Sequence, residues 1–302
     1  MSGVYRELAE ALLAVDRDHR PLNVGVAAQL ACLLEVSAPK PGNVSPGRHF
    51  ADLRYEDFLA SALAIGEPMA GAGERGVGST IRLAIEATAR LTRSNSNLGI
   101  VLLFAPLARA ASLAGTPLQH ELRQVLDATS IDDAREAYVA IRLARPGGLD
   151  RAESQDVSSE PTMTLVDVMR LAAHRDTIAS EYATGFDVTF GVAVPALERA
   201  RRDGLPWDDA VVETFLTLLA AIPDTHIARR SGPGLAADVT THARRVLAAG
   251  GVRSEAGRQA IDDMDRRLRD VRNSGNPGTT ADLTAAAIFV VLLGGGFSDV
   301  AE

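Results

Sequence analysis

The sequence predicts an all-α protein, a single-domain bundle of many helices whose polar loops converge on one cleft. Hydrophobic residues make up 46% of the 302 residues, whereas aromatic residues make up only 4%. A core of Leu, Ala, Val and Ile suits close helix packing better than a β-sandwich. Apolar residues also recur at helical spacing along most of the chain, and strict two-residue alternation is hard to find.

Helical periodicity recurs in eight segments. In the first of them, Leu8, Leu12 and Val15 fall on one helical face. The stretch GFDVTFGVAVPALERA is the best strand candidate, but its flanks favour helix. Thr164 and the pair Thr279–Thr280 stand where N-caps are expected. We expect helices over residues 5–16, 79–92, 132–145, 164–184, 207–222, 235–249, 254–271 and 280–294.

Helix breakers cluster between these segments. The longest polar gap is interpreted as a surface loop rather than a linker, because motif-like residues lie on both sides of it. Residues 1–302 are therefore treated as one domain. The breakers fall at residues 38–48, 66–78, 93–98, 146–163, 203–206, 230–234 and 272–278.

Charge and cysteine content exclude several classes of protein. The formal net charge is −8 and no long Lys/Arg run occurs, which argues against a nucleic-acid partner. Cys32 is the sole cysteine, so no intrachain disulfide can form, as suits a reducing cytoplasm. The charged N-terminus is unlike a signal peptide. The most apolar run, LTAAAIFVVLLGGGF, is shorter than the roughly 20 residues that span a bilayer, so we expect no membrane partner. A homodimer is the default oligomer.

The stretch EVSAPKPGNVSPGRHFADL is the first polar element with chemical potential. It holds the only lysine of the chain, Lys40, beside Gly42, whose amide can face an anion. Glu35, His49 and Asp52 offer a base or a metal-facing oxygen. The residues alone fit this interpretation and a polar loop that caps helices about equally.

Two further elements stand at predicted helix starts. Asn95, Asn97 and Gly99 precede an apolar helix, where exposed amide groups favour phosphate or carboxylate. Asn276 lies in a turn, and Asp282 falls in the first turn of the helix that follows. Ordinary helix capping is the competing interpretation in both places.

The segment IPDTHIARRSGPG joins a carboxylate to cationic side chains. Asp224 and Thr225 offer oxygens that Mg²⁺ prefers, while Arg229 and Arg230 supply forked donors for phosphate. A surface cap with a local Asp–Arg pair explains the same residues equally well.

A weaker element, AHRDTIASEYATGF, contains Arg175 and Asp176, which equally fit routine surface charges. Expected nucleotide motifs are missing: the chain has no G-x-x-x-x-G-K-[ST] loop and no G-x-G-x-x-G after a strand. Nucleotide chemistry, if the chain has it, is of another type.

Taken together, the motifs resemble those of the triphosphoribosyl-dephospho-CoA synthase family. The resemblance rests on E-V-x-x-x-K-P-G-N-V, H-x-x-D-L, N-x-N-L-G with A-P-L-A, DAREAYVAIRLARPGGL, TLVDVMRLAAHRDTIASEY, DTHIARRSG and NPGTTADLTAAAIF, from about Glu35 to about Val291. Members nearest the citrate lyase enzymes tend to have N-T-H-K-G where this chain has NSNLG, and Gly-Leu-Val where it has Gly42-Asn43-Val44. The chain looks like a divergent branch, and the acceptor stays open.

The resemblance implies an all-helical enzyme that uses ATP and dephospho-CoA and releases adenine. It implies one shared site that contains Glu35, Lys40, Asn43, His49, Asp52, Asn95, Asn97, Asp224, Arg229, Asn276 and Asp282.

Roles follow from the chemistry of displacing adenine at C1′ of ATP, where oxocarbenium character develops. Glu35 is the first choice for the base that deprotonates the attacking hydroxyl, Asp224 is the second, and His49 is a candidate acid for adenine. Phosphate contacts are expected from Lys40, Gly42, Asn43, Asn95, Asn97, Gly99, Thr225, Arg229, Arg230 and Asn276. Mg²⁺ is expected on Asp52, Asp224 and Asp282.

Two other functions compete with this transferase. A magnesium-dependent hydrolase of the ADP-ribosyl type would cleave the same bond with water; DTH at residues 224–226 is similar to its D-T-D element, but no G-D-x-x-G occurs. A non-catalytic nucleotide- or CoA-binding protein is the third interpretation.

Overall fold

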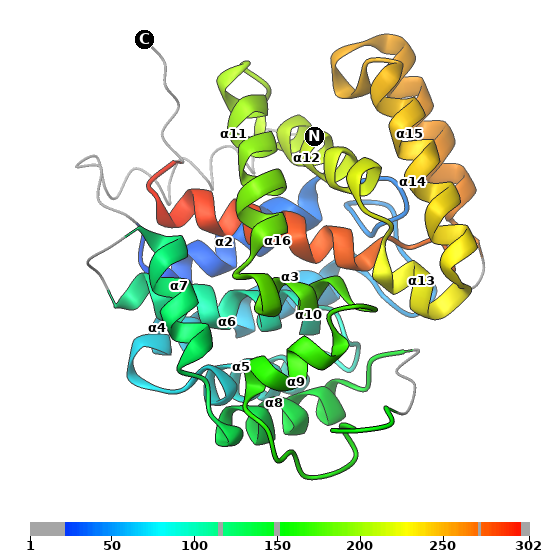
Figure 1. Ribbon diagram of the computed structural model, residues 1–302. Helices are drawn as coiled ribbons and strands as arrows, with labels where there is room; N and C mark the ends of the chain where they lie inside the picture. Colours follow the sequence, from blue (N-terminus) through cyan, green and yellow to red (C-terminus); the bar gives the residue numbers. More distant parts are fainter. Residues whose placement is uncertain (1–21, 114–116, 148–151, 271–272, 297–302) are drawn as a thin grey trace.

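A computed structural model describes residues 22–113, 117–147, 152–270 and 273–296 of the chain (Figure 1). Within these ranges the regular structure is helical, and the extended pairing is one isolated bridge between Ser45 and Arg48. The predicted helix over residues 5–16 lies outside the described residues. The first half of the helices are α2 Val24–Ser37, α3 Tyr55–Ala64, α4 Gly66–Ala70, η1 Ala72–Glu74, α5 Val77–Leu91, α6 Leu98–Ser112, α7 Leu118–Asp127 and α8 Ile131–Ala144. The second half are α9 Leu165–Ala172, α10 Thr177–Thr184, η2 Thr189–Ala193, α11 Val194–Arg202, α12 Trp207–Ala221, α13 Thr225–Ser231, α14 Pro233–Ala248, η3 Gly251–Arg253, α15 Glu255–Leu268 and α16 Gly278–Leu293.

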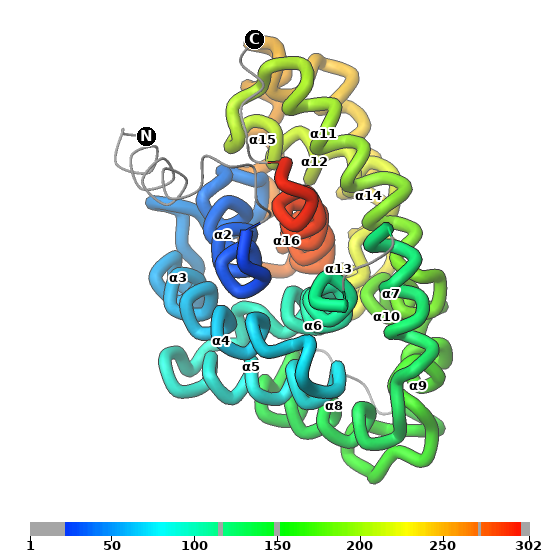
Figure 2. Tube along the Cα trace, turned by 90° about the vertical axis from the view of Figure 1, so that its left-hand side faces the viewer, coloured from blue at the N-terminus to red at the C-terminus, as the bar shows by residue number. Residues whose placement is uncertain are grey.

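Helix α16 lies at the centre of the molecule. Figure 2 looks nearly along it and shows α2, α6 and α12 around it, each of which packs against it. Its sequence is apolar on every side, with Ala285, Ala286 and Ala287 fully buried, and such small residues let neighbouring helices approach closely. The rings of Phe104 and Phe289 stack at 4.4 Å between α6 and α16. The core therefore joins segments from both ends of the described chain.

No single helix in the described ranges is long and apolar enough to cross a membrane. The bent pair formed by Trp207–Ala221 and Thr225–Ser231 passes that test jointly, by length and composition alone.

The structure confirms the all-α class and most of the predicted helices. Thr164 is confirmed as an N-cap, since its side chain accepts a hydrogen bond from the amide of Asp167. The strand candidate GFDVTFGVAVPALERA is helical, in η2 and α11.

Three boundary predictions were wrong. The segment 164–184 forms two helices, α9 and α10, because Asp176 caps a new helix by accepting from the amide of Ala179. The breaker region 66–78 contains α4 and η1. Helix α16 begins at Gly278, so Thr279 and Thr280 are not caps, and Asp282 lies beyond the first turn.

The described part of the loop over residues 146–163 folds back on α8. The hydroxyl of Tyr138 donates to the carbonyl of Gln155, and Arg142 donates to the carbonyl of Val157 at 2.7 Å. This packing fits a loop rather than a linker, while the single-domain assignment stays a prediction.

Candidate active site

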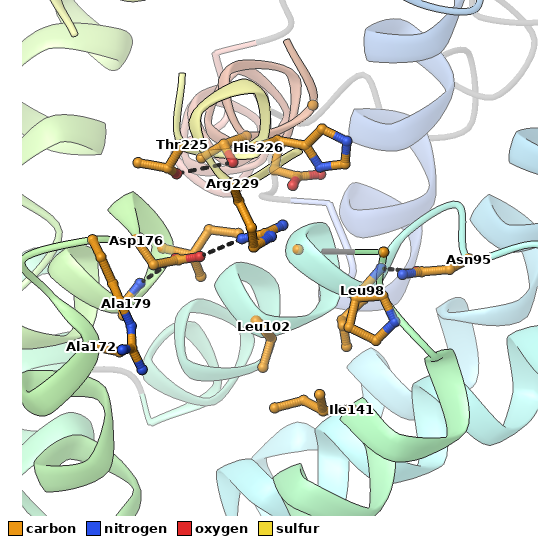
Figure 3. Close-up of a pocket in the computed structure, with 18 of the residues that line it drawn as sticks. Asn95, Leu98, Leu102, Ile141, Ala172, Asp176, Ala179, Thr225, His226 and Arg229 are labelled. Carbon is orange, nitrogen blue, oxygen red and sulfur yellow. Dashed lines mark hydrogen bonds and ion pairs between the residues drawn. The ribbon is translucent and has the colours of Figure 1, made fainter. Parts of the chain in front are cut away.

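A cavity of about 1340 Å³ opens between the helices (Figure 3). Its walls come from the end of α2 and the following loop, the start of α6, the end of α8, the α9–α10 junction, α13 and the start of α16. Typical ligand pockets hold roughly 300–1,000 Å³, so this cavity exceeds the space that one small ligand needs. Polar segments far apart in the sequence meet here, as the resemblance implied.

Four carboxylates line the cavity: Glu35 from α2, Asp156 from the loop after α8, Asp176 at the start of α10 and Asp282 from α16. Burial raises the pKa of Asp282 well above its ordinary value, and the negative charge of Glu35 raises it further. No hydrogen bond to the Asp282 carboxylate is formed within the described chain. Gly99, at the start of α6, lets the Asp282 carboxylate lie close to the α6 backbone, because a Cβ on residue 99 would collide with that carboxylate. Asp282 therefore favours its protonated form, in which it can donate a proton.

Glu35 forms a buried ion pair with Lys40, at 2.9 Å between Nζ and Oε1, and Lys40 is 0% exposed. The Lys40 ammonium also donates to the backbone carbonyls of Glu35 and Ala38. Glu35 lines the cavity and Lys40 does not. The lysine therefore holds the end of α2 and its carboxylate in place, and the structure does not bring it to the predicted phosphate position.

Asn43 and Asn276 form an amide pair on the same side of the cavity. The Asn43 Nδ2 donates to the Asn276 Oδ1 at 2.7 Å, and the buried Asn43 Oδ1 has no hydrogen-bond partner in the described part of the chain. Gly42 has a φ of 78°, and its amide donates to Asp265 Oδ1 at 2.8 Å. That amide is thus already used, and Gly42 does not line the cavity.

Asn95, Asn97 and Gly99 all line the cavity where α6 begins. The Asn95 Oδ1 accepts from the amide of Leu98 at 3.3 Å, which Figure 3 shows, and Asn97 donates to Thr88 Oγ1 at 3.0 Å. The two asparagines thus shape the helix start. The positive end of the α6 dipole lies on the cavity side, near Asp282.

Both carboxylate oxygens of Asp224 accept hydrogen bonds within the protein. Its Oδ1 caps α13 by accepting from the amide of Ile227 at 2.9 Å, while its Oδ2 accepts from the amide and the hydroxyl of Thr280. Burial raises its pKa, and these hydrogen bonds oppose that rise. Its carboxylate does not line the cavity, whereas the adjacent Thr225 does. The geometry therefore does not support Asp224 as base or metal ligand.

Arg229 points into the cavity and pairs with Asp176, at 2.9 Å between Nη1 and Oδ2 (Figure 3). Its Nε is buried without a partner among the described residues. Arg230, by contrast, is exposed and lies outside the cavity wall. His226 lines the cavity, and burial with the neighbouring arginines lowers its pKa to about 4, so it is neutral near pH 7.

The sequence interpretation missed further cations in the cavity wall. Arg142 and Arg145, at the end of α8, and Arg175, before α10, all line it. Arg145 and Arg175 form no ion pair with another described residue. The sequence around Arg175 and Asp176 fitted ordinary surface charges, because no local pattern shows which side of a helix junction faces a cavity. Arg142 and Arg145 lie within the motif DAREAYVAIRLARPGGL, but their spacing is not distinctive.

His49 and Asp52 do not reach the cavity. His49 is exposed, accepts from the amide of Tyr55 at 3.2 Å, and lines a smaller hollow with Asp262 and Arg269. Asp52 lies on an exposed loop. In the part of the chain that the structure describes, no three His, Cys, Asp or Glu side chains gather in a way that could hold a metal ion. The predicted magnesium set of Asp52, Asp224 and Asp282 therefore does not fit such a centre.

In the described part of the chain, the helices enclose one large cavity lined by acids, amides and arginines. The family model for ATP:dephospho-CoA triphosphoribosyl transferase matches residues 21–300. The chain belongs to this family, which confirms the resemblance inferred from the motifs.

The individual proteins to which this chain is similar have assignments that agree with this family. A protein of Pseudomonas putida assigned as 2-(5''-triphosphoribosyl)-3'-dephosphocoenzyme-A synthase is 37% identical over 106 residues, which are 35% of this chain and 37% of that protein. A protein of Pseudomonas syringae pv. syringae with the same assignment is 31% identical over 168 residues, 52% and 53% of the two chains. The alignments thus span about a third to a half of these relatives. A crystal structure from Archaeoglobus fulgidus, assigned as a triphosphoribosyl-dephospho-CoA synthase, has a TM-score of 0.61 and 27% identity, covering 78% of this chain and 97% of that one.

Proposed function

We propose that this protein transfers the 5-triphosphoribosyl group of ATP to a hydroxyl of dephospho-CoA and releases adenine. The family supports this reaction class. The observation that carries the proposal is the cavity of about 1340 Å³, where the Glu35 and Asp282 carboxylates and several arginines line the same walls. A transfer between two nucleotides needs room for both, and the cavity exceeds the size of an ordinary single-ligand pocket.

The carboxylates divide the proton transfers between them. Glu35 takes the proton of the attacking hydroxyl as the new C1′–O bond forms. The C1′–N9 bond breaks, and its electrons leave with adenine. Asp282 supplies the proton that neutralises the departing base, since its raised pKa keeps it protonated. Asp282 replaces His49 in this role, because His49 lies outside the cavity.

The triphosphate interacts with the arginines. Arg145 and Arg175 have charges that no described carboxylate neutralises, and Arg229 adds an unused Nε. Guanidinium groups suit phosphate oxygens, because they offer paired donors in one plane. ATP enters as its magnesium complex, with the phosphates holding the ion in place of the predicted three carboxylates. A cytoplasmic location and a homodimer stay predictions.

Mass spectrometry of products tests the proposal. Purified protein with Mg²⁺, ATP and dephospho-CoA should form one triphosphoribosyl adduct for each adenine released. Adenine and ribose triphosphate in equal amounts without an acceptor would instead establish the hydrolase. Binding of ATP with neither product would show a nucleotide-binding protein, and either result would overturn the transferase.

A further inference from the structure

One wall of the cavity is apolar and aromatic. It consists of Val36, Val44, Phe50, Leu53 and Phe58, which we call the aromatic wall. Val36 and Val44 are buried and belong, with Tyr55, to a small hydrophobic cluster separate from the main core. Phe50, Leu53 and Phe58 are only half-buried and pack against that cluster. Apolar side chains that a protein leaves partly open to a cavity are suited to cover an apolar part of a ligand.

The two phenylalanines are held by different parts of the chain. Phe50 lies in the loop between α2 and α3, where the Arg269 guanidinium is 5.6 Å from its ring centre. Arg269 is itself held by Asp265 and by the backbone carbonyl of Asn43. Phe58 belongs to α3. Phe50 is therefore held by a cation contact and Phe58 by its helix, so stacking a flat ligand against the two rings needs little rearrangement.

The aromatic wall lies directly beside the polar groups that face the reacting atoms. Glu35 precedes Val36 in the chain, Asn43 precedes Val44, and all four line the cavity. The Asn43 Oδ1 is a buried acceptor that has no donor among the described residues. A buried acceptor without a donor is unfavourable, so a ligand that brings an N–H group gains from pairing with it.

We propose that the aromatic wall and Asn43 bind an adenine ring. Adenine has two flat faces for the phenylalanines and an exocyclic amino group for the Asn43 acceptor. This inference rests on the proposed function and deepens it, because both substrates contain adenine. The adenine of ATP leaves from C1′, and the adenine of dephospho-CoA is attached to the ribose that carries the acceptor hydroxyl. Either ring is close to the bond that forms, whereas the pantetheine arm is at the far end of the diphosphate.

Binding of free adenine tests the inference without turnover. Titration calorimetry should show that Phe58→Leu, which keeps an apolar side chain and removes the aromatic face, weakens adenine binding about tenfold. The control Leu171→Ala changes another cavity-lining apolar residue, from α9, and should leave adenine affinity unchanged. Circular dichroism verifies that both variants are folded. Unchanged adenine affinity in folded Phe58→Leu would overturn the inference.

Testing the role of Asn43 requires a comparison ligand that lacks the exocyclic amino group of adenine. Wild-type protein should bind adenine more tightly than unsubstituted purine. Asn43→Ala should abolish that preference, while Asn43→Asp, which keeps an acceptor oxygen, should retain it. A preference for adenine that survives in Asn43→Ala would remove Asn43 from the subsite.

The Kd values of ATP and of dephospho-CoA for Phe58→Leu identify which substrate supplies the adenine ring. A rise in the Kd of ATP alone assigns the subsite to the leaving adenine, and a rise in the Kd of dephospho-CoA alone assigns it to the acceptor. Both results support an adenine subsite. If the wild-type protein forms no transfer product but Phe58→Leu still loses adenine affinity, the proposed function fails and the subsite stands.

Discussion

The carboxylate of Asp224 accepts two hydrogen bonds from Thr280, one from its amide at 2.8 Å and one from its hydroxyl at 2.7 Å. The other carboxylate oxygen caps α13 through the amide of Ile227. One buried side chain thus satisfies donors at the starts of two helices, α13 and α16, that both line the cavity. Asp224 fixes the relative position of these two walls.

Asp224→Ala should lower the free energy of unfolding by about 2–4 kcal/mol, since a lost N-cap costs about 1 kcal/mol and unsatisfied buried donors add more. Urea denaturation measures the change. Thr164→Ala is the matched control, because Thr164 caps only its own helix and should cost about 1 kcal/mol. Equal losses in the two variants would show that Asp224 does not join α13 to α16.

Lys40→Met should destabilise the protein by about 3–5 kcal/mol, because it leaves the buried Glu35 carboxylate without its partner. The double variant Lys40→Met/Glu35→Met should recover much of that loss, since it buries no unpaired charge. Denaturation of the two single variants and the double variant measures the coupling. Strictly additive losses would contradict a structural ion pair.

Glu35→Gln should reduce adenine release by at least about 100-fold while ATP binding stays nearly unchanged, because an amide cannot take the proton of the attacking hydroxyl. Glu86→Gln is the control, since it makes the same substitution in an ion pair that lies outside the cavity. Single-turnover assays and ATP titration separate the two effects. Retained turnover in Glu35→Gln would exclude this residue as the base.

Asp282→Asn should raise the melting temperature at neutral pH and abolish transfer. The Asp282 pKa in the folded protein is raised above its ordinary value of 3.8, so the folded state holds this proton more tightly than the unfolded chain does. Its stabilising contribution is complete below that ordinary pKa and is lost as pH rises through the folded value. The variant does not titrate, so its advantage should shrink as pH falls toward 3.8. Melting curves across this range give the answer, and an advantage independent of pH would contradict it.

Arg175→Gln and Arg145→Gln should each raise the KM for ATP by about tenfold, because a charge-assisted contact to phosphate is lost. The effect should weaken at high salt, since exposed charges are screened. Arg199→Gln, which changes an exposed arginine outside the cavity, is the matched control. Identical KM values for all three variants would place the triphosphate elsewhere.

Local pattern was sufficient to predict most of the helices. Apolar periodicity depends on each segment's own residues, and α5, α8, α12, α14 and α15 lie close to their expected ranges. The failure over residues 164–184 has a local cause as well, since Asp176 could be read as a helical residue or as a cap. Only the packed structure decides between the two.

The site was predicted less completely, because long-range contacts determine side-chain roles. Lys40 is conspicuous in the sequence, but nothing nearby shows that it turns inward to Glu35. Aspartate is a common metal ligand, so Asp224 fitted that role in the sequence. Its carboxylate instead accepts hydrogen bonds from Thr280, which is 56 residues away in the chain. Arg175 lacked a distinctive spacing, and only its position beside the cavity reveals it.

The central position of α16 has a consequence for synthesis of the protein. Asp282 reaches the cavity from this helix, while Glu35 reaches it from α2, the first described helix. A growing chain on the ribosome therefore has no complete pocket until the segment Gly278–Leu293 has emerged.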